Sequence, residues 1–327
     1  MNPHKLNSQF EWRDHTGPFR IISEEQARQY DEQGFFVFEH AFGIETMREL
    51  IAVIDPIEEA VANVVREKLG GKAFIMRSDE ITFVTHIVKQ AKVARDFTRC
   101  SFFQDLTHDL LGPNVRLYWD QSVYKKPGTQ DVFPWHQDNG YTFVEPQHYL
   151  TCWVSLTDAD EENGCPMVYP GIHRRGTLAH QMTDLGWDCV GNEEVPGVAT
   201  PVRAGSVVVF SSLTPHMTVP NITTDRTRKT YIVQFAPDGA EVLTSKTATV
   251  SDIYLARGDG PAAPVESEIG RLVIHPTGNP AGLRVGERFA ADILFDSEPL
   301  AGYDITLFTP ASGREEGEAD TSLTTDK

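Results

Sequence analysis

The chain has 327 residues, and 40% of them are hydrophobic, so it can bury a sizeable core in one large domain or in two. Its 29 lysines and arginines are outnumbered by 47 aspartates and glutamates, and the formal charge of −18 argues against a nucleic-acid partner and favours a small-molecule substrate. Since we find no signal-peptide core, no apolar run of membrane-spanning length and no CxxC pair among four cysteines, we expect a reduced, cytoplasmic protein without a membrane partner.

Helices are predicted in the N-terminal third. Ser23-Glu24-Glu25-Gln26 has the form of a capping box and Gly34 is a helix stop, so residues 24–33 should form a helix that leads into a strand at 35–38. Apolar residues at helical spacing predict a second helical region over 44–69, which Pro56 should break. Residues 92–111 also indicate a helix, whereas 74–88 show no clean period and are interpreted as a lid or a connection.

Strands are predicted from residue 115 onward, at 115–124, across 135–138, and at 150–156, 206–210 and 229–235. Strands separated by turns and preceded by helices favour a mainly β (α+β) fold. We expect a double-stranded β-helix (jelly roll) core with helices packed on one face. This domain should occupy residues 1–250.

The chain changes character after residue 250. Gly258 to Pro264 reads as part of a linker over 251–270. Short β-like segments separated by glycine and proline then predict a small C-terminal β appendage over 271–312. Residues 313–327 are polar and acidic, and we expect a disordered tail.

The most informative stretch is Trp135-His136-Gln137-Asp138. If it is a strand, side-chain alternation places His136 and Asp138 on the same face, at a spacing that suits two ligands of one metal ion. An imidazole and a carboxylate do not distinguish zinc from iron. His216 is the candidate third ligand, because it follows a predicted buried strand, Val207 to Phe210. Two histidines and one carboxylate form the facial triad associated with non-haem Fe(II) oxygenases, in which one face of the metal stays open for O2 and a co-substrate.

Two arginines, Arg226 and Arg228, open the β-prone segment that follows His216. A fixed guanidinium can pair bidentately with the far carboxylate of a dicarboxylate co-substrate. The two arginines lie in the same strand phase, so alternation does not choose between them.

Several ordered pieces carry a resemblance to a known family: Trp135 to Asp138, Tyr149 to Val154, Glu162 to His173, and His216 to Phe235. Together they resemble the phytanoyl-CoA dioxygenase-like family of Fe(II)/2-oxoglutarate-dependent oxygenases over roughly residues 20–240. The resemblance implies the cofactors Fe(II), 2-oxoglutarate and O2, with 2-oxoglutarate decarboxylated oxidatively to succinate and CO2 while hydrogen is abstracted from an unactivated C–H bond.

The resemblance also assigns candidate residues. It favours Arg228 over Arg226 as the 2-oxoglutarate anchor, because the family's arginine opens the strand after a loop whose asparagine, here Asn221, lies five positions past the distal histidine. Thr218 and Trp153 match residues that contact or wall the co-substrate, although an ordinary strand residue and a core aromatic are the alternatives. Tyr124 is a further candidate for the co-substrate pocket, and the expected substrate-entrance residues are Gln137, Asn139 and Tyr141.

The predicted function is therefore a 2-oxoglutarate-dependent dioxygenase that hydroxylates or desaturates a small organic metabolite, since Asp138 fills the position that halogenating relatives leave small. The alternatives are a metal-binding cupin-like protein without oxygenase activity, a zinc hydrolase on the same barrel, or a non-catalytic relative. The first two have no use for an arginine at a fixed distance past His216. A CoA thioester is a weaker substrate candidate, because the cations available for its phosphates, Lys125-Lys126 and Arg174-Arg175, are few.

Overall fold

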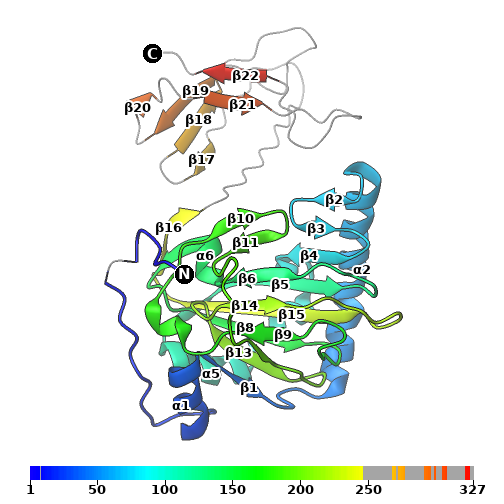
Figure 1. Cartoon of the computed structure of the whole chain (residues 1–327), viewed down its shortest axis with the longest axis vertical. Coiled ribbons are helices and arrows are strands. Elements are labelled where there is room, and N and C mark those ends of the chain that lie inside the picture. Colours follow the sequence, from blue (N-terminus) through cyan, green and yellow to red (C-terminus); the bar gives the residue numbers. More distant parts are fainter. Residues whose placement is uncertain are drawn as a thin grey trace. The chain divides into compact units, whose positions relative to one another are not determined.

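A computed structural model describes residues 1–7 and 9–245 and six short strands between residues 267 and 324 (Figure 1). The chain divides into two compact units, Met1–Thr247 and Ala248–Lys327. Apart from residues 267–269, the predicted linker at 251–270 lies outside the described residues.

The first unit is built on an eight-stranded antiparallel sheet, here called the main sheet (Figure 1). Its strand order is β1-β13-β8-β15-β5-β4-β3-β2. The strands are β1 (Phe35–Phe38), β2 (Lys72–Ala73), β3 (Met76–Arg77), β4 (Ile81–Thr85), β5 (Val115–Lys125), β8 (Leu150–Ser155), β13 (Val207–Ser211) and β15 (Arg228–Pro237).

A second, four-stranded antiparallel sheet has the order β12-β9-β14-β6 and is here called the small sheet. Its strands are β12 (Val198–Ala199), β9 (Pro166–Val168), β14 (His216–Thr218) and β6 (Phe133–His136). Two two-stranded sheets complete the described part of the unit: the hairpin of β10 (Gln181–Thr183) with β11 (Gly186–Asp188), and the pair of β7 (Thr142–Glu145) with β16 (Glu241–Ser245).

Strand alternation in the main sheet supplies two separate apolar layers. Val208 and Phe210 of β13 pack with Val168 of the small sheet, so the small sheet covers one face. Val207 and Val209, one residue out of phase, pack with the helices on the opposite face. The expectation of a mainly β fold with helices on one face is confirmed in this coarse form.

Five helices precede β5: α1 (Glu24–Gln33), α2 (Ile44–Lys68), α3 (Ile87–Gln90), α4 (Lys92–Phe97) and α5 (Ser101–Leu111). The predicted capping box of α1 is present, and Gly34 ends the helix in the left-handed region at φ 85°. The α1 and β1 predictions are therefore confirmed.

Three predictions in this part were wrong. Helix α2 continues through Pro56, because a continuous buried stripe that includes Leu50, Ile54 and Ala62 packs against the core and offsets the lost backbone hydrogen bond. Residues 74–88 are neither a lid nor a connection, since they contain β3 and β4 of the main sheet. The predicted helix at 92–111 is two helices, α4 and α5, separated at residues 98–100.

The second unit contains a four-stranded antiparallel sheet and a separate strand pair among its described residues. The sheet is formed by β17 (Ser267–Ile269), β18 (Leu272–Pro276), β19 (Ala291–Phe295) and β20 (Glu298–Pro299), and β21 (Asp304–Leu307) pairs with β22 (Thr321–Thr324). At β22 the structure differs from the expected disordered tail, since threonine and leucine favour a strand more than the acidic residues before them.

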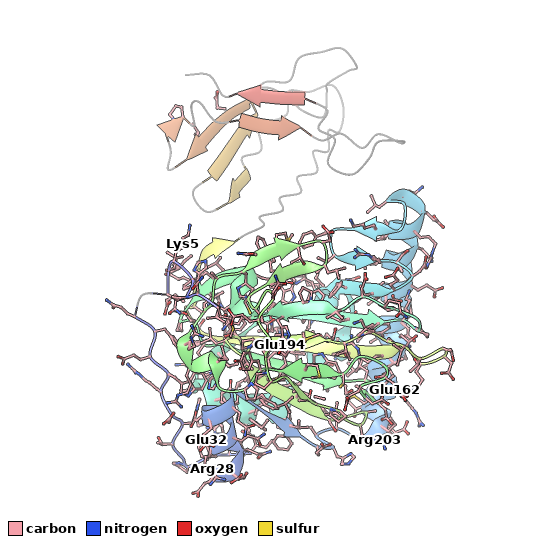
Figure 2. All side chains as sticks on the ribbon, in the orientation of Figure 1. Lys5, Arg28, Glu32, Glu162, Glu194 and Arg203 are labelled. Atoms are coloured by element: carbon pink, nitrogen blue, oxygen red, sulfur yellow. The ribbon has the colours of Figure 1, made fainter. Side chains whose placement is uncertain are left out.

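Lys5, Glu162 and Arg203 are exposed charged residues at the surface of the first unit (Figure 2). The four cysteines are free thiols. Among the described residues, no helix combines the length and apolar character that crossing a membrane requires.

Candidate active site

The two predicted histidine ligands come from neighbouring strands of the small sheet. β14 pairs antiparallel with β6, and the register sets His216 directly opposite His136. The strand prediction for Asp138 was wrong, because β6 ends at His136 and Asp138 begins the short helix α6 (Asp138–Tyr141). The turn nevertheless returns its carboxylate to the histidines, and candidate ligand atoms of His136, Asp138 and His216 lie within 4.8 Å of one another.

Backbone carbonyls orient both imidazoles. His136 Nδ1 lies 2.8 Å from the Pro134 carbonyl oxygen, and His216 Nδ1 lies 3.0 Å from that of Thr214. A carbonyl oxygen only accepts, so each Nδ1 is the protonated nitrogen and each Nε2 keeps its lone pair. These Nε2 atoms lie 4.0 and 3.8 Å from Asp138 Oδ1, a spacing that suits three ligands of one metal ion.

Further contacts adjust the charge and position of the ligands. Burial lowers the pKa of His136 well below its usual range, so the imidazole stays neutral as a metal ligand must. Thr151 on β8 donates a hydrogen bond of 2.5 Å to Asp138 Oδ2, and Gln234 on β15 donates one of 3.1 Å to the Thr151 hydroxyl. Residues of the main sheet thus hold the carboxylate of Asp138, the candidate ligand at the start of α6. Two neutral nitrogens and one carboxylate oxygen fit Fe(II).

Arg228 is buried at the start of β15, with none of its surface exposed. Its guanidinium lies over the indole of Trp153, 5.4 Å from the ring centroid, and Nη1 donates a hydrogen bond of 2.9 Å to Thr230. Nε and Nη2 are buried without a protein partner. Burial lowers the pKa of Arg228 to about 10, and among the described residues no carboxylate pairs with its guanidinium, so these two donors suit an anion.

Lys125 is a second buried cation beside Arg228, and the sequence analysis missed its place in the site. The two residues are paired across β5 and β15. Lys125 Nζ donates to the Val219 carbonyl at 2.6 Å and lies 3.3 Å from the Thr218 hydroxyl. Burial, and then the charge of Arg228, lowers the pKa of Lys125 to about 7. These contacts link the start of β15 to Thr218, two residues past His216.

Arg226 lies outside this cluster. Its guanidinium is on the surface, paired with Asp160 at 2.5 Å and with Glu162 at 2.9 Å. Its charge is therefore already compensated, whereas that of Arg228 is not. The geometry favours Arg228 as the anion anchor.

The structure contradicts the prediction that Tyr124 reaches the co-substrate pocket. Lys125 faces Thr218, so its neighbour Tyr124 points to the opposite face of the main sheet. There its hydroxyl donates a hydrogen bond of 2.8 Å to Asp55 of α2, and the ammonium of Lys229 lies 5.2 Å from its ring centroid. Tyr124 belongs to the helix-facing layer.

Gln137 and Asn139 were also expected at the substrate entrance, and the structure places both in the interior. The Gln137 side chain donates to the carbonyls of Gly176 and Leu213 and accepts from the backbone of Leu178. Asn139 uses its amide in the same way, with Thr177 and Val144 as partners. Their polar atoms are occupied in fixing the loops around the ligands, so they are not free to contact a substrate.

Tyr141 remains beside the ligands. Its ring meets that of His136 edge-on at a centroid distance of 5.3 Å, and its hydroxyl accepts a hydrogen bond of 3.4 Å from the backbone of Trp187 in β11. Burial raises the pKa of this phenol, so it stays protonated. Tyr141 thereby joins the β10–β11 hairpin to the metal-ligand strand.

Comparison with proteins of known sequence finds relatives whose names describe oxygenases. A probable alpha-ketoglutarate-dependent hypophosphite dioxygenase of Stutzerimonas stutzeri is 26% identical over 233 residues, which cover 67% of this chain and 80% of that protein. The ectoine dioxygenase of Bordetella parapertussis is 27% identical over 227 residues, 62% of this chain and 71% of that protein. The phytanoyl-CoA dioxygenase of Arabidopsis thaliana is 26% identical, but the match spans 39% of this chain and 47% of the relative.

Solved structures share the fold. The non-heme alpha ketoglutarate dependent carbocyclase SnoK from nogalamycin biosynthesis superposes with a TM-score of 0.56 at 24% identity, covering 69% of this chain and 88% of the other. The epimerase SnoN, solved with Fe3+, alpha ketoglutarate and nogalamycin RO, gives a TM-score of 0.55 at 19% identity and covers 72% and 91% of the two chains. The family model described as Phytanoyl-CoA dioxygenase (PhyH) matches residues 30–230. With this match over more than half of its length, the chain belongs to the phytanoyl-CoA dioxygenase family of iron- and 2-oxoglutarate-dependent dioxygenases.

Proposed function

We propose that this dioxygenase hydroxylates an unactivated C–H bond of a small organic metabolite and couples that reaction to the decarboxylation of 2-oxoglutarate to succinate. We propose His136, Asp138 and His216 as the iron ligands and Arg228 as the anchor of the far carboxylate of 2-oxoglutarate. The two facing sheets of residues 1–250, in this proposal, form the double-stranded β-helix that holds both.

One observation carries the proposal: the buried guanidinium of Arg228 has two donors, Nε and Nη2, without a partner. A planar guanidinium with two free donors matches a carboxylate in bidentate geometry. A cupin-like metal protein or a zinc hydrolase built on the same three ligands would have no need for this costly buried cation. The oxygenase explains both the ligand triad and the cation.

In this proposal each group of residues has its own role. His136, Asp138 and His216 would hold the iron, which together with 2-oxoglutarate and O2 would supply the oxidising chemistry when bound. Arg228 orients the co-substrate, while Trp153 forms the wall on which the guanidinium rests. Lys125 and Thr218 supply a further cation and a hydroxyl at the same end of β15.

We place the substrate beside the ligand cluster. Tyr141 lies beside His136 there and is the entrance residue that we retain. The names of the relatives refer to compounds as different as hypophosphite, methylphosphonate and ectoine, so they do not narrow the substrate class beyond small molecules. Because Asp138 provides a carboxylate ligand, we propose hydroxylation, with desaturation as the related outcome.

The test is succinate formation by purified protein loaded with Fe(II) under anaerobic conditions and then exposed to O2 and 2-oxoglutarate. We expect slow uncoupled succinate release, stimulated by the true substrate within a panel of metabolites, and lost in Arg228→Ala. Arg226→Ala is the matched control and should behave as wild type. Native protein that holds zinc tightly and neither binds nor turns over 2-oxoglutarate would overturn the proposal.

A further inference from the structure

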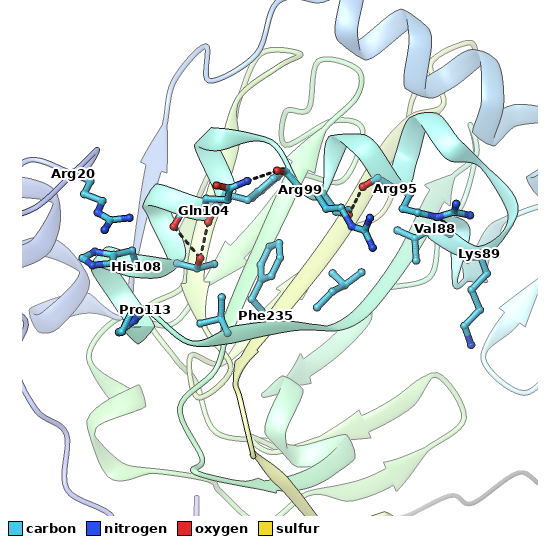
Figure 3. A pocket seen from close by; sticks show the side chains of 14 residues that line it. Arg20, Val88, Lys89, Arg95, Arg99, Gln104, His108, Pro113 and Phe235 are labelled. Carbon is cyan, nitrogen blue, oxygen red and sulfur yellow. Dashed lines mark hydrogen bonds between the residues drawn. The ribbon is translucent and has the colours of Figure 1, made fainter.

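A cavity of about 830 Å³ lies on the helix-facing side of the main sheet, away from the metal ligands (Figure 3). It is bounded by α3, α4 and α5 and by the adjoining ends of β5 and β15. On β15, Phe235 faces this cavity, whereas Gln234, one residue earlier, faces Thr151 and the metal ligands. The main sheet therefore separates the two places.

The floor of the cavity is apolar. Phe103 and Phe235 are almost fully buried, and their rings contact each other at a tilt of 37° with centroids 5.5 Å apart. Leu117 and Val115 of β5 extend this floor. Thr107, at the edge of the cavity, donates a hydrogen bond from its hydroxyl to the Phe103 carbonyl oxygen, so this hydroxyl does not add a free donor to the floor. A cavity of this size with an apolar floor can hold a small organic molecule.

The lysine and arginine side chains that line the cavity give its rim a positive charge. Arg20, Lys89, Arg95 and Arg99 line the cavity, and no aspartate or glutamate does. Figure 3 shows them spread along the cavity, with Arg20 at one end and Lys89 at the other. Such a concentration of cations is unusual in a chain with a formal charge of −18. A second cavity, beside α2, is lined by Asp55, Glu58 and Glu59 as well as by cations, so it does not share this absence of acids.

The four cations differ in their partners. Arg20 forms a salt bridge of 3.6 Å with Asp105. Arg95 Nε donates a hydrogen bond of 3.0 Å to the Val88 carbonyl oxygen. Within the described part of the chain, Lys89 and Arg99 form no ion pair, and both are exposed. They are the groups available to an anion whose apolar part rests on the floor.

We propose that this cavity is a binding site for an amphipathic organic anion, with the carboxylate or sulfonate held by Arg99 and Lys89 and the hydrocarbon part packed on Phe103, Phe235 and Leu117. The site is separate from the metal centre and goes beyond the proposed function. Arg95 supplies additional positive potential beside the acid group.

Calorimetric titration of the full-length protein with sodium octanoate and sodium decanoate, below their micellar concentrations, tests this proposal. We expect one site per chain, with binding about fourfold tighter for each added methylene because each is buried on the apolar floor. Arg99→Gln should weaken decanoate binding about tenfold, and Lys89→Gln should weaken it in the same direction, through loss of a charge-assisted hydrogen bond. Both side chains are exposed, so the variants should keep the wild-type Tm and succinate release.

Two controls locate the site. Lys68→Gln removes an exposed cation of α2 outside the cavity and should leave binding unchanged. Arg228→Ala should also bind decanoate normally, because the proposed 2-oxoglutarate anchor lies across the sheet.

Several outcomes would overturn the proposal. Decanoate binding that survives Arg99→Gln and Lys89→Gln, or that disappears in Arg228→Ala, would place the ligand elsewhere. Octan-1-ol binding as tightly as octanoate would exclude an anion site, and inorganic phosphate binding as tightly as decanoate would exclude the apolar floor. Cosedimentation with phosphatidylglycerol vesicles in place of binding to free decanoate would assign the cations to a membrane surface.

Discussion

Replacing Arg228 by methionine should change ligand-free stability and co-substrate binding in opposite directions. In the ligand-free protein the guanidinium is buried with one hydrogen bond, to Thr230, and with two unpartnered nitrogens. Lowering the pKa of Arg228 from 12.5 to about 10 corresponds to about 3 kcal/mol of unfavourable charging. An apolar side chain of similar length removes this cost, so Arg228→Met should raise the free energy of unfolding by about 1–3 kcal/mol.

The same substitution should remove most of the stabilisation that bound 2-oxoglutarate gives to the folded protein. Two charge-assisted hydrogen bonds to a carboxylate are worth about 1.5–3 kcal/mol each, so their loss should weaken 2-oxoglutarate binding by about 10²- to 10⁴-fold. At a ligand concentration of about 100 times the wild-type Kd, wild-type protein gains about 2.7 kcal/mol of stability, and Arg228→Met should gain at most about 0.4 kcal/mol.

Urea unfolding followed by tryptophan fluorescence, with and without 2-oxoglutarate on anaerobic Fe(II)-loaded protein, measures both effects. Arg226→Met is the matched control, because its exposed guanidinium pairs with Asp160 and Glu162 and should contribute under about 1 kcal/mol. If 2-oxoglutarate stabilises Arg228→Met as much as wild type, the anchor lies elsewhere. If the ligand-free variant is strongly destabilised, the guanidinium has a protein partner and the reasoning from its unpaired nitrogens fails.

Three further predictions concern the neighbours of the site. Thr151→Val removes the hydrogen bond to Asp138 and should weaken Fe(II) binding about 10- to 100-fold in anaerobic calorimetry, whereas unchanged affinity would show that Asp138 is held by other contacts. Because burial lowers the pKa of Lys125 from 10.5 to about 7, the unfolded chain binds the additional proton between these pH values, so wild-type stability should rise from pH 7 towards pH 10. In Lys125→Met the free energy of unfolding, measured by urea unfolding, should change less between about pH 7 and pH 10 than in wild type. An equal change in the two proteins would contradict the burial argument. Tyr124→Phe loses its hydrogen bond to Asp55 and should cost about 1 kcal/mol of stability without changing 2-oxoglutarate affinity, while a weaker affinity would return Tyr124 to the pocket.

The sequence predicted those features that depend on a few neighbouring residues. The capping box at Ser23 and the left-handed stop at Gly34 depend on contacts within one helix, and both are present. His136, Asp138 and His216 were identified by residue type and order, and the register of β6 with β14 brings the two histidines together. The strand alternation offered for Asp138 was nevertheless the wrong geometry, since a turn rather than a strand presents it.

Other residues required the tertiary structure. Strand alternation fixes that Tyr124 and Lys125 point in opposite directions, but only the packing of helices and small sheet on the two faces decides which one meets the site. The sequence position of Gln137 predicts an entrance residue. In the structure its amide donates hydrogen bonds to the carbonyls of Gly176 and Leu213, which are distant in sequence.

The amino-acid sequence alone indicated the candidate metal ligands, the mainly β architecture and the two candidate arginines. The folded chain favours Arg228 over Arg226, because the acids that pair with Arg226 come from another loop, while no described residue supplies an acid to Arg228. Pairing and burial of charge depend on segments that meet only on folding, and no local spacing rule encodes them.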